Sequence, residues 1–360
     1  MNIYNRGMFP HLEDWITRSE RPPIITMTTD FGQYDGYVGT MKGVIHTLLP
    51  NAKVVDISHD IAPHQINEGA FIVYRAYRYF PASAVHIAVV DPGVGSSRRP
   101  IVLVTRHGTF VGPDNGIFTY VLRAELTARH EESPESEVEG EQEAATNYGP
   151  IALSNDPAWA GGMWGVAPNW EGDEPAGKRS RTQRFRSAGG SNDLPRAYHL
   201  DNPNYWLRSI SSTFHGRDIF APVAAHLASG AQADRIGSAI PLQSLVKLPI
   251  GAPRVHRSGQ TVTVVGQIVH IDRFGNIITN LPERLLEPIF LNKPQLTIEV
   301  GGHVIKGMSN AYNDVREGQP VALIGSERLL EIAVRNSNAA HRMKVRTGDP
   351  VRIVISDRKS

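Results

Sequence analysis

Several acidic side chains and one histidine stand directly after apolar runs of the sequence. Asp30 follows IITMTT, His59 follows VVDIS, and Asp91 follows HIAVV. Further polar residues in such positions are Asp35, Asp60, Asp114 and Asn115. Carboxylates and imidazoles transfer protons, and the same groups bind metal ions. Turns, helix caps and core packing also explain residues of these types, so both interpretations are open here.

Asp91 differs from the other acids because it ends a strongly apolar strand pattern and precedes the turn PGVG. A carboxylate in such a place needs a partner, since burying an unpaired charge is costly. Arg98 and Arg99 follow closely, and we expect one of them to form the ion pair. An Asp–Arg pair in a cleft is a candidate for proton transfer, whereas elsewhere it is a structural salt bridge.

Two later segments carry further candidates. His215 lies in the sharp turn STFHGRD, and Gly216 leaves open space beside its ring. The segment HIDRFGNIITN places Asp272, Phe274 and Asn276 in one hairpin-like stretch. A helix cap and a plain turn are the alternative explanations. The Asn276 amide both donates and accepts hydrogen bonds, so it is suited to reading a base edge.

The elements that must position these residues follow from apolar periodicity. IITMTT, AKVVDIS, AVHIAVV and IVLVT are strand patterns, and helical patterns cover residues 38–49, 67–80 and 218–228. This alternation predicts an α/β fold whose N-terminal layered domain has a mostly parallel sheet. Ligands of such sheets bind beyond the carboxyl ends of the strands, so we expect the acids to share one rim.

Near residue 256 the apolar period changes to two. Short strand patterns from TVTVVGQIVHID to VRIVI predict a smaller C-terminal all-β barrel or sandwich domain. We therefore expect an extension over residues 1–22, an α/β domain over 23–240, a linker over 241–255 and a β domain over 256–360.

The α/β pattern is interrupted at about 128–200 by an insertion. It carries seven glutamates between Glu131 and Glu143, five basic residues between Lys178 and Arg186, and three of the five tryptophans. A poorly ordered surface segment, a lid or subunit-contact loop, and a basic nucleic-acid contact are all compatible with this composition.

Composition excludes several classes of protein. The 37 lysines and arginines nearly balance the 36 acidic residues. The chain therefore has no overall electrostatic field that would attract nucleic acid or a membrane surface. The absence of cysteine excludes disulfides, zinc–thiolate sites and cysteine nucleophiles. No apolar run approaches the roughly 18 residues of a membrane helix. The N-terminal residues lack the charged and then apolar pattern of a secretory signal peptide. We expect a cytoplasmic enzyme, with its chemistry still open.

The chain resembles the S-adenosyl-L-methionine (SAM) hydroxide adenosyltransferases, or adenosine-forming SAM hydrolases, which are relatives of the fluorinase and chlorinase. The resemblance covers residues 24–125 and 202–350 and rests on segments in one order: TTDFG, DGYVGTMKGVI, VVDISHDI, NEGAF, VVDPGVGSSRR, GPDNG, STFHGRDIFAPVAAHL and IDRFGNIITN. It implies homotrimers that hold SAM between the α/β domain of one subunit and the β domain of its neighbour. Water displaces methionine from ribose C5′ and gives adenosine and L-methionine. SAM is the substrate, and no cofactor or metal is expected.

The resemblance also implies roles for individual residues. The water-activating set is Asp91, Arg98 and His215, with Arg98 preferred to Arg99 by spacing. Asp30 matches the acid that binds the ribose hydroxyls, and Asp272 the acid that holds the methionine ammonium. The other substrate-binding residues implied are Asp35, Tyr37, His64, Thr213, Phe214, Gly216, Phe274, Asn276, Ser326 and Asn336.

Differences between this sequence and the related halogenases narrow the reaction that we expect. The halogenases lack the acid and the histidine that match Asp91 and His215, and the fluorinase has a serine in place of Gly216, so halide use is not expected. His64 replaces a fluorinase tryptophan, and Glu327 replaces an arginine that helps to bind the carboxylate. Two alternatives remain from the residues alone: a metal-dependent phosphoester hydrolase and a non-catalytic protein that binds SAM or adenosine.

Overall fold

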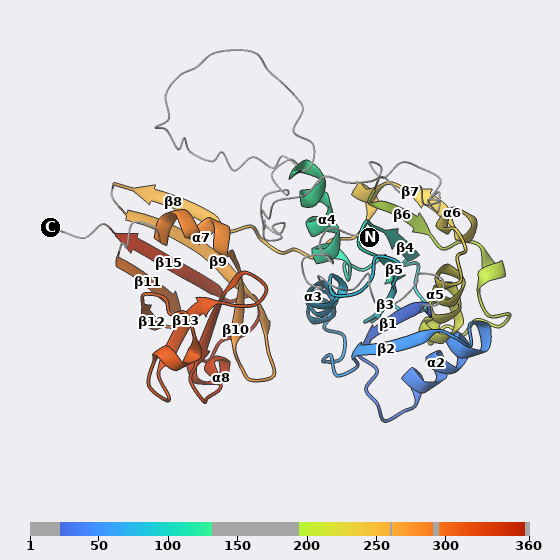
Figure 1. The fold of residues 1–360 in the computed structure, drawn as a ribbon, viewed down its shortest axis with the longest axis horizontal. Coiled ribbons are helices and arrows are strands. Elements are labelled where there is room, and N and C mark those ends of the chain that lie inside the picture. The colour runs from blue at the N-terminus through green and yellow to red at the C-terminus, as the bar shows by residue number, and fades with distance from the viewer. Residues whose placement is uncertain (1–21, 132–193, 260, 291–294, 357–360) are drawn as a thin grey trace, which may run out of the picture. The chain divides into compact units, whose positions relative to one another are not determined.

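The structure is a computed structural model that describes residues 22–131, 194–259, 261–290 and 295–356. The chain divides into two compact units, Met1–Leu248 and Pro249–Ser360. Most of the predicted extension (1–22) and of the predicted insertion (about 128–200) lies outside the described residues. Figure 1 shows the elements of each unit.

The first unit alternates strands and helices over its first part. Its strands are β1 (Ile24–Thr29), β2 (Lys53–Ser58), β3 (Val85–Val89), β4 (Pro100–Val104), β5 (Thr109–Pro113), β6 (Arg196–His199) and β7 (Ser238–Ile240). Its α-helices are α2 (Tyr37–Leu48), α3 (Ile66–Tyr77), α4 (Thr119–Glu131), α5 (Ala221–Ala228) and α6 (Ala233–Ile236). A π-helical turn, Gly216–Phe220, leads directly into α5. The predicted α/β class is confirmed.

The sheet of the first unit is mixed, whereas the sequence predicts a mostly parallel one. Among the described residues its strand order is β2-β1-β3-β5-β4-β6-β7. The first four strands are parallel to one another, while β4, β6 and β7 join by antiparallel pairing. The reason lies between β4 and β5, where a four-residue turn, 105–108, is too short for the crossover that parallel strands need.

Helices cover both faces of this sheet, with α2 and α5 on one face and α3 and α4 on the other (Figure 1). Side chains alternate along β1, so that Ile25 and Met27 pack with α2 and α5 while Thr26 faces the α3 side and bonds to His86. Met41 and Ile45 of α2 are fully buried in the first of these layers. Two covered faces explain the unbroken apolar runs.

The second unit is an antiparallel β domain, as predicted. Its strands are β8 (Arg254–Ser258), β9 (Thr261–Ile271), β10 (Ile277–Pro282), β11 (Gln295–Val300), β12 (His303–Lys306), β13 (Pro320–Ile324), β14 (Leu329–Val334) and β15 (Pro350–Ser356). The described strands follow the order β12-β11-β15-β9-β10-β14-β13, with β8 also on β9. The ends of this path approach each other, because Ser309 N–H donates to the Ala322 carbonyl on β13 at 2.8 Å. The sheet therefore curls into a nearly closed barrel around one apolar core.

Two short helices complete the second unit, α7 (Glu283–Phe290) and α8 (Ala339–Met343). In the part of the chain that the structure describes, no helix is both long enough and apolar enough to cross a bilayer.

Candidate active site

Asp91 and Arg98 form a buried ion pair beyond the end of β3. Arg98 Nε donates to Asp91 Oδ1 at 3.0 Å, and Nη2 donates to Oδ2. The side chains are only 3% exposed for Asp91 and 9% exposed for Arg98. Two parallel bonds from one guanidinium fix the plane of the carboxylate. The pair is thus oriented as well as neutralised.

The same guanidinium reaches the histidine predicted from the STFHGRD turn. Arg98 Nη2 lies 2.8 Å from His215 Nδ1. Arginine can only donate, so Nδ1 must accept, and the proton of the neutral ring sits on Nε2. Burial and the nearby Arg98 cation lower the pKa of His215, partly offset by Asp91 and Asp218. Arg98 therefore joins a carboxylate and a neutral imidazole in one set, which we call the reactive triad.

Two loops must fit closely to bring the reactive triad together. Gly95, between Asp91 and Arg98, has φ 77°, and a Cβ added there would lie 2.3 Å from the carbonyl oxygen of Ser212. Only glycine tolerates both this backbone conformation and this approach. The glycine of the PGVG turn thus lets the Asp91 loop seat against the segment that carries His215.

Aromatic side chains pack around Gly216, next to His215. Phe214 lies edge-on to Phe31 and Tyr37, with ring centroids 5.8 Å and 5.0 Å away. A Cβ on Gly216 would come within 3.0 to 3.3 Å of Met41, Phe31 and Phe214. Gly216 is buried, whereas Tyr37 is 46% exposed. The segments after β1 and before α5 therefore share one aromatic wall.

Asp30 begins the turn after β1, and its Oδ2 accepts the main-chain N–H of His64 at 2.9 Å. His64 adopts a left-handed backbone conformation, with φ 68°. The end of β1 is held by His59, whose Nδ1 lies 2.8 Å from the Thr29 hydroxyl and whose Nε2 lies 3.0 Å from Asp56. His59 is thus a packed, hydrogen-bonded histidine.

Asp35 and Asp60 are exposed in turns of the first unit, and Thr213 is exposed on the loop before His215. The Thr213 hydroxyl lies 3.1 Å from that of Ser211, within its own loop. None of these side chains has a hydrogen bond or ion pair to the reactive triad among the described contacts.

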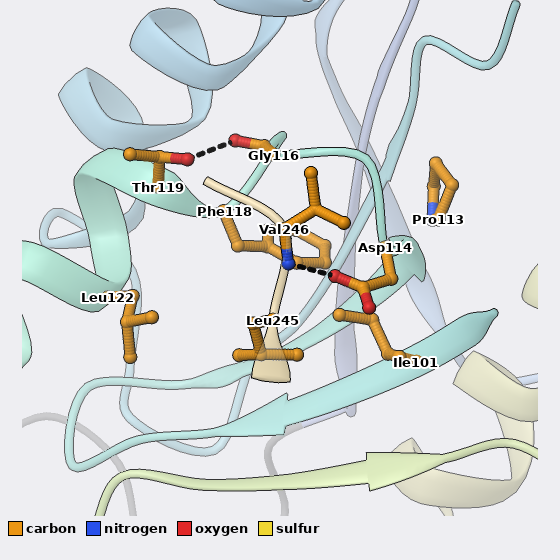
Figure 2. Close-up of a pocket in the computed structure, with 9 residues that line it drawn as sticks. All are labelled: Ile101, Pro113, Asp114, Gly116, Phe118, Thr119, Leu122, Leu245 and Val246. Carbon is orange, nitrogen blue, oxygen red and sulfur yellow. Dashed lines mark hydrogen bonds between the residues drawn. The ribbon is translucent and has the colours of Figure 1, made fainter. Parts of the chain in front are cut away.

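Arg99 has a different partner from Arg98. Its Nε donates to Asp114 at 3.0 Å, and its guanidinium also bonds to the Ser244 carbonyl at 2.6 Å. Asp114 in turn accepts the N–H of Val246 at 2.9 Å, as Figure 2 shows. The GPDNG segment, predicted at the rim, thus anchors the chain that leads out of the first unit. Of the two arginines, Arg98 is the one paired with Asp91.

In the second unit, Asp272 organises the turn between β9 and β10. Its Oδ1 accepts the N–H groups of Phe274 and Asn276 at 2.9 and 2.8 Å, and its Oδ2 accepts the Asn276 amide at 3.0 Å. Phe274 is 76% exposed at the tip. Gly275 has φ 84°, and a Cβ there would clash with Asn338 at 2.1 Å. Asp272 therefore shapes the turn, and part of the Asn276 amide is used within it.

The remaining predicted residues of this unit lie in turns around β14. Ser326 and Glu327 connect β13 to β14, and Asn336 follows β14 with φ 56°. Nearby, the Tyr312 hydroxyl donates to buried Glu331 at 2.5 Å. Burial and Glu331 raise the pKa of Tyr312, and Asp272 and Glu327 add to this effect. Sequence reasoning missed Tyr312, because no motif marks the segment that contains it.

The metal-site alternative needs at least three ligands in one place. In the described residues, no three His, Asp or Glu side chains come together in a way that could hold a metal ion. Candidate ligands for that alternative are instead engaged by different partners: Asp30 accepts from His64, His59 is bonded to Thr29, and Asp91 is paired with Arg98. The other candidates are Asp35, Asp60 and His215.

Comparison with known proteins adds an independent result. The SAM hydroxide adenosyltransferase N-terminal domain matches residues 25–148 and 187–237, and the C-terminal domain of that family matches residues 266–352.

Individual relatives match over nearly the whole chain. The (R)-S-adenosyl-L-methionine hydrolase of Thermus thermophilus is 31% identical over 91% of this chain and 97% of its own. A crystal structure of an uncharacterized conserved protein from Thermotoga maritima has a TM-score of 0.66 at 29% identity, covering 92% of this chain and 99% of that one. The fluorinase of Nocardia brasiliensis is 23% identical over 94% of this chain and 99% of its own. With both domains matched in order, the chain belongs to the SAM hydroxide adenosyltransferase family.

Proposed function

We propose that this protein hydrolyses SAM to adenosine and L-methionine by attack of water at ribose C5′. The observation that carries the proposal is the reactive triad, in which one guanidinium holds an ionised carboxylate and a neutral imidazole. Relatives named (R)-S-adenosyl-L-methionine hydrolase support the substrate. A protein that only binds SAM has no need of a water-activating group.

The chemistry requires a nucleophile rather than an acid. The bond from water oxygen to C5′ forms while the C5′–S bond breaks, and its electron pair leaves with sulfur. The sulfonium thus becomes the neutral thioether of methionine, which needs no proton. The water proton passes to Asp91, which acts as general base. Arg98 pairs with Asp91 through two hydrogen bonds and fixes its orientation.

The tautomer of His215 defines its role. Its Nδ1 lone pair is occupied by Arg98, and its Nε2 carries the proton, so the ring cannot take a proton from water. It can donate a hydrogen bond to the attacking oxygen. We assign to it the positioning of that oxygen in line with the C–S bond, a role in which orientation lowers the barrier.

Substrate recognition divides between the two units. We assign the ribose hydroxyls to Asp30 and the wall of the pocket to Asp35, Tyr37, His64, Thr213, Phe214 and Gly216. We assign the methionine and adenine ends to residues of the second unit, namely Asp272, Phe274, Asn276, Ser326 and Asn336. A cytoplasmic homotrimer, with each site made by two neighbouring subunits, is the assembly that we propose.

The configuration at sulfur is part of the proposal. The name of the relatives specifies the (R) epimer of the sulfonium centre. With the C5′–S bond held in line with the water, inversion at sulfur exchanges the directions of the methyl group and the methionine chain. A site that also fixes the methionine chain therefore distinguishes the epimers. We propose that the (R) epimer is the substrate of this protein too.

The test is incubation of the purified protein with each SAM epimer separately, following adenosine and methionine by chromatography. We expect equal amounts of both products, faster with the (R) epimer, and the same rate in EDTA and in chloride. With Asp91→Ala, adenosine formation is expected to be about 1,000-fold slower. Tight SAM binding without turnover would instead establish a sensor. Activity that EDTA abolishes, on a phosphoester and not on SAM, would establish a metal-dependent hydrolase.

A further inference from the structure

Asp218 is a fully buried carboxylate that the mechanism does not use. It lies in the π-helical turn Gly216–Phe220, three residues after His215, and its side chain is 0% exposed. A buried charge must be paired and hydrogen-bonded to be tolerated. Isolated π-helical turns are frequent at functional sites. The partners of Asp218 therefore indicate what this charge does.

The Asp218 carboxylate binds two parts of the chain. Its Oδ2 accepts the main-chain N–H of Ser211 at 2.7 Å. Arg217 donates to both of its oxygens, at 2.6 Å from Nε and 3.0 Å from Nη2. The Arg217 guanidinium also lies 5.1 Å from the centre of the Phe214 ring. Asp218 thus reaches back over the loop in front of His215.

The main chain of Asp218 adds two further attachments to the same loop. Its carbonyl accepts the N–H of Leu207 at 2.9 Å, and its N–H donates to the Phe214 carbonyl at 3.1 Å. Residues 207, 211 and 214 are therefore all tied to one residue. This loop, 207–215, carries Ser212, on which Gly95 of the Asp91 loop is seated, and it ends at His215.

We propose that Asp218 is a positioning residue for the reaction: it holds the 207–215 loop so that His215 Nδ1 meets Arg98. This inference rests on the proposed function. His215 is attached to Arg98 by one hydrogen bond, so its position depends on the loop behind it. A displacement of about 1 Å in a reacting group can lower a rate by about 100-fold. Asp218 acts through His215 and does not touch the substrate.

The test compares Asp218→Ala and Asp218→Asn with a matched control. Asp201→Asn serves as the control, because Asp201 also accepts a main-chain N–H, that of Ser238 at 3.0 Å, but outside the 207–215 loop. We expect Asp218→Ala to lower kcat by about 100-fold and Asp218→Asn by about 10-fold, with KM changed by less than about threefold. Asparagine keeps an acceptor for Ser211, which explains the partial rescue. Asp201→Asn is expected to leave kcat unchanged.

A double-mutant cycle separates positioning from general destabilisation. If Asp218 acts through His215, adding Asp218→Ala to His215→Ala lowers kcat by less than about threefold further. An equal loss in both backgrounds would overturn the proposal. So would a kcat of Asp218→Ala close to that of the unmodified protein. If Asp218→Ala does not fold, Asp218→Asn takes its place in the cycle.

Amide hydrogen exchange gives a readout that does not depend on activity. We expect peptides covering 207–215 to exchange faster in Asp218→Ala, with peptides of the β domain unchanged. If the unmodified protein forms no adenosine from SAM, the proposed function fails while this exchange result stands. Unchanged exchange at 207–215 would overturn the positioning role even in an active enzyme.

Discussion

Arg98 Nη2 lies 2.8 Å from His215 Nδ1, although 117 residues separate them along the chain. The same guanidinium binds both carboxylate oxygens of Asp91. One planar cation therefore orients a carboxylate and, because arginine can only donate, fixes the tautomer of an imidazole. A lysine, which presents a point charge, has no such rigid fork of donors.

Removal of the base should stop the chemistry and spare binding. Asp91→Ala is expected to lower kcat by about 1,000-fold, within the range that general bases contribute. SAM affinity, measured by calorimetry, is expected to change little because the proposed role of Asp91 is to bind the attacking water and not SAM itself. Asp60→Asn, an exposed acid from the same predicted rim, is the control and should retain full activity. Normal turnover by Asp91→Ala would refute the assigned base.

The neighbouring arginines should respond differently to the same substitution. Arg98→Lys removes the fork that joins Asp91 to His215, and we expect kcat to fall about 100-fold or more. Arg99→Lys loosens the Asp114 and Ser244 contacts instead, and we expect a loss of about 1 kcal/mol in the free energy of unfolding with kcat within about threefold. Rates and denaturation curves of both variants check this. Equal loss of kcat in both would contradict the separation of roles.

Most helices and strands of the fold could be predicted from the sequence, because the periods of their apolar residues are clear. Val38, Met41 and Ile45 recur at helical spacing and are buried on α2. It could not supply the antiparallel half of the first sheet, because the apolar run of β4 is the same whichever way its neighbours run. Pairing depends on connection length and on contacts far along the chain.

The sequence identified Asp91, Arg98 and His215 as candidates, but geometry adds what spacing cannot. Spacing within the family resemblance favours Arg98 over the adjacent Arg99, and the structure adds the partner of each, Asp91 and Asp114 respectively. Asp218 escaped notice because an acid beside an arginine in a helix-forming segment is typical of a surface pair. Its burial comes from the π-helical turn, which has no sequence signal of its own.

The pH dependence of activity follows from His215. Burial and Arg98 lower the pKa of His215 below 6.5, so the ring stays neutral as the pH falls through that value. Protonation at Nδ1 would place a positive ring against Arg98 and break their hydrogen bond. We therefore expect kcat/KM to stay level from pH 8 to about 6.5 and to decline only under more acidic conditions. If kcat/KM instead declined on the acid side with a midpoint above pH 6.5, and His215→Asn abolished that decline, this prediction would be wrong.

Acid stability should depend on His86. Burial lowers the pKa of His86 to about 3 from 6.5, and the ring stacks on Phe110 at 4.8 Å. Because the folded state resists protonation, this contribution to stability is present above pH 6.5 and is lost as the pH falls from 6.5 towards 3. The loss is about 1.4 kcal/mol per pH unit across that window.

Denaturation curves at pH 7 and pH 5 test this prediction. His86→Gln is expected to be less stable at pH 7 but to lose about 2 kcal/mol less than the unmodified protein on going to pH 5. The exposed His46→Gln is the control, with the pH effect unchanged. If His86→Gln and the unmodified protein lose the same free energy of unfolding between pH 7 and pH 5, groups other than His86 determine the stability in acid.

Two glycines with the same backbone conformation should differ sharply in tolerance. Gly95 has φ 77° and a Cβ there would meet Ser212, whereas Gly302 has φ 76° and nothing within 4 Å. Both alanine variants carry a backbone penalty of about 1 kcal/mol. Gly95→Ala must also push the His215 loop away, so we expect about 10-fold or greater loss of kcat in this variant alone. Similar activities for the two variants would contradict the close fit of the loops.

The attachment of residues 244–248 to the first unit has a mechanical consequence. Val246 is tied to Asp114, and the N–H of Leu248 donates to the Thr119 hydroxyl at 2.9 Å. Only residues 249–253 then remain before β8 begins at Arg254. The tether between the units is therefore short, and the chain that leads into it is fixed to the first unit by Arg99, Asp114 and Thr119. Since Arg99 is bonded through one peptide to Arg98, the residue that anchors the tether and the residue that holds Asp91 and His215 share a single stretch of backbone.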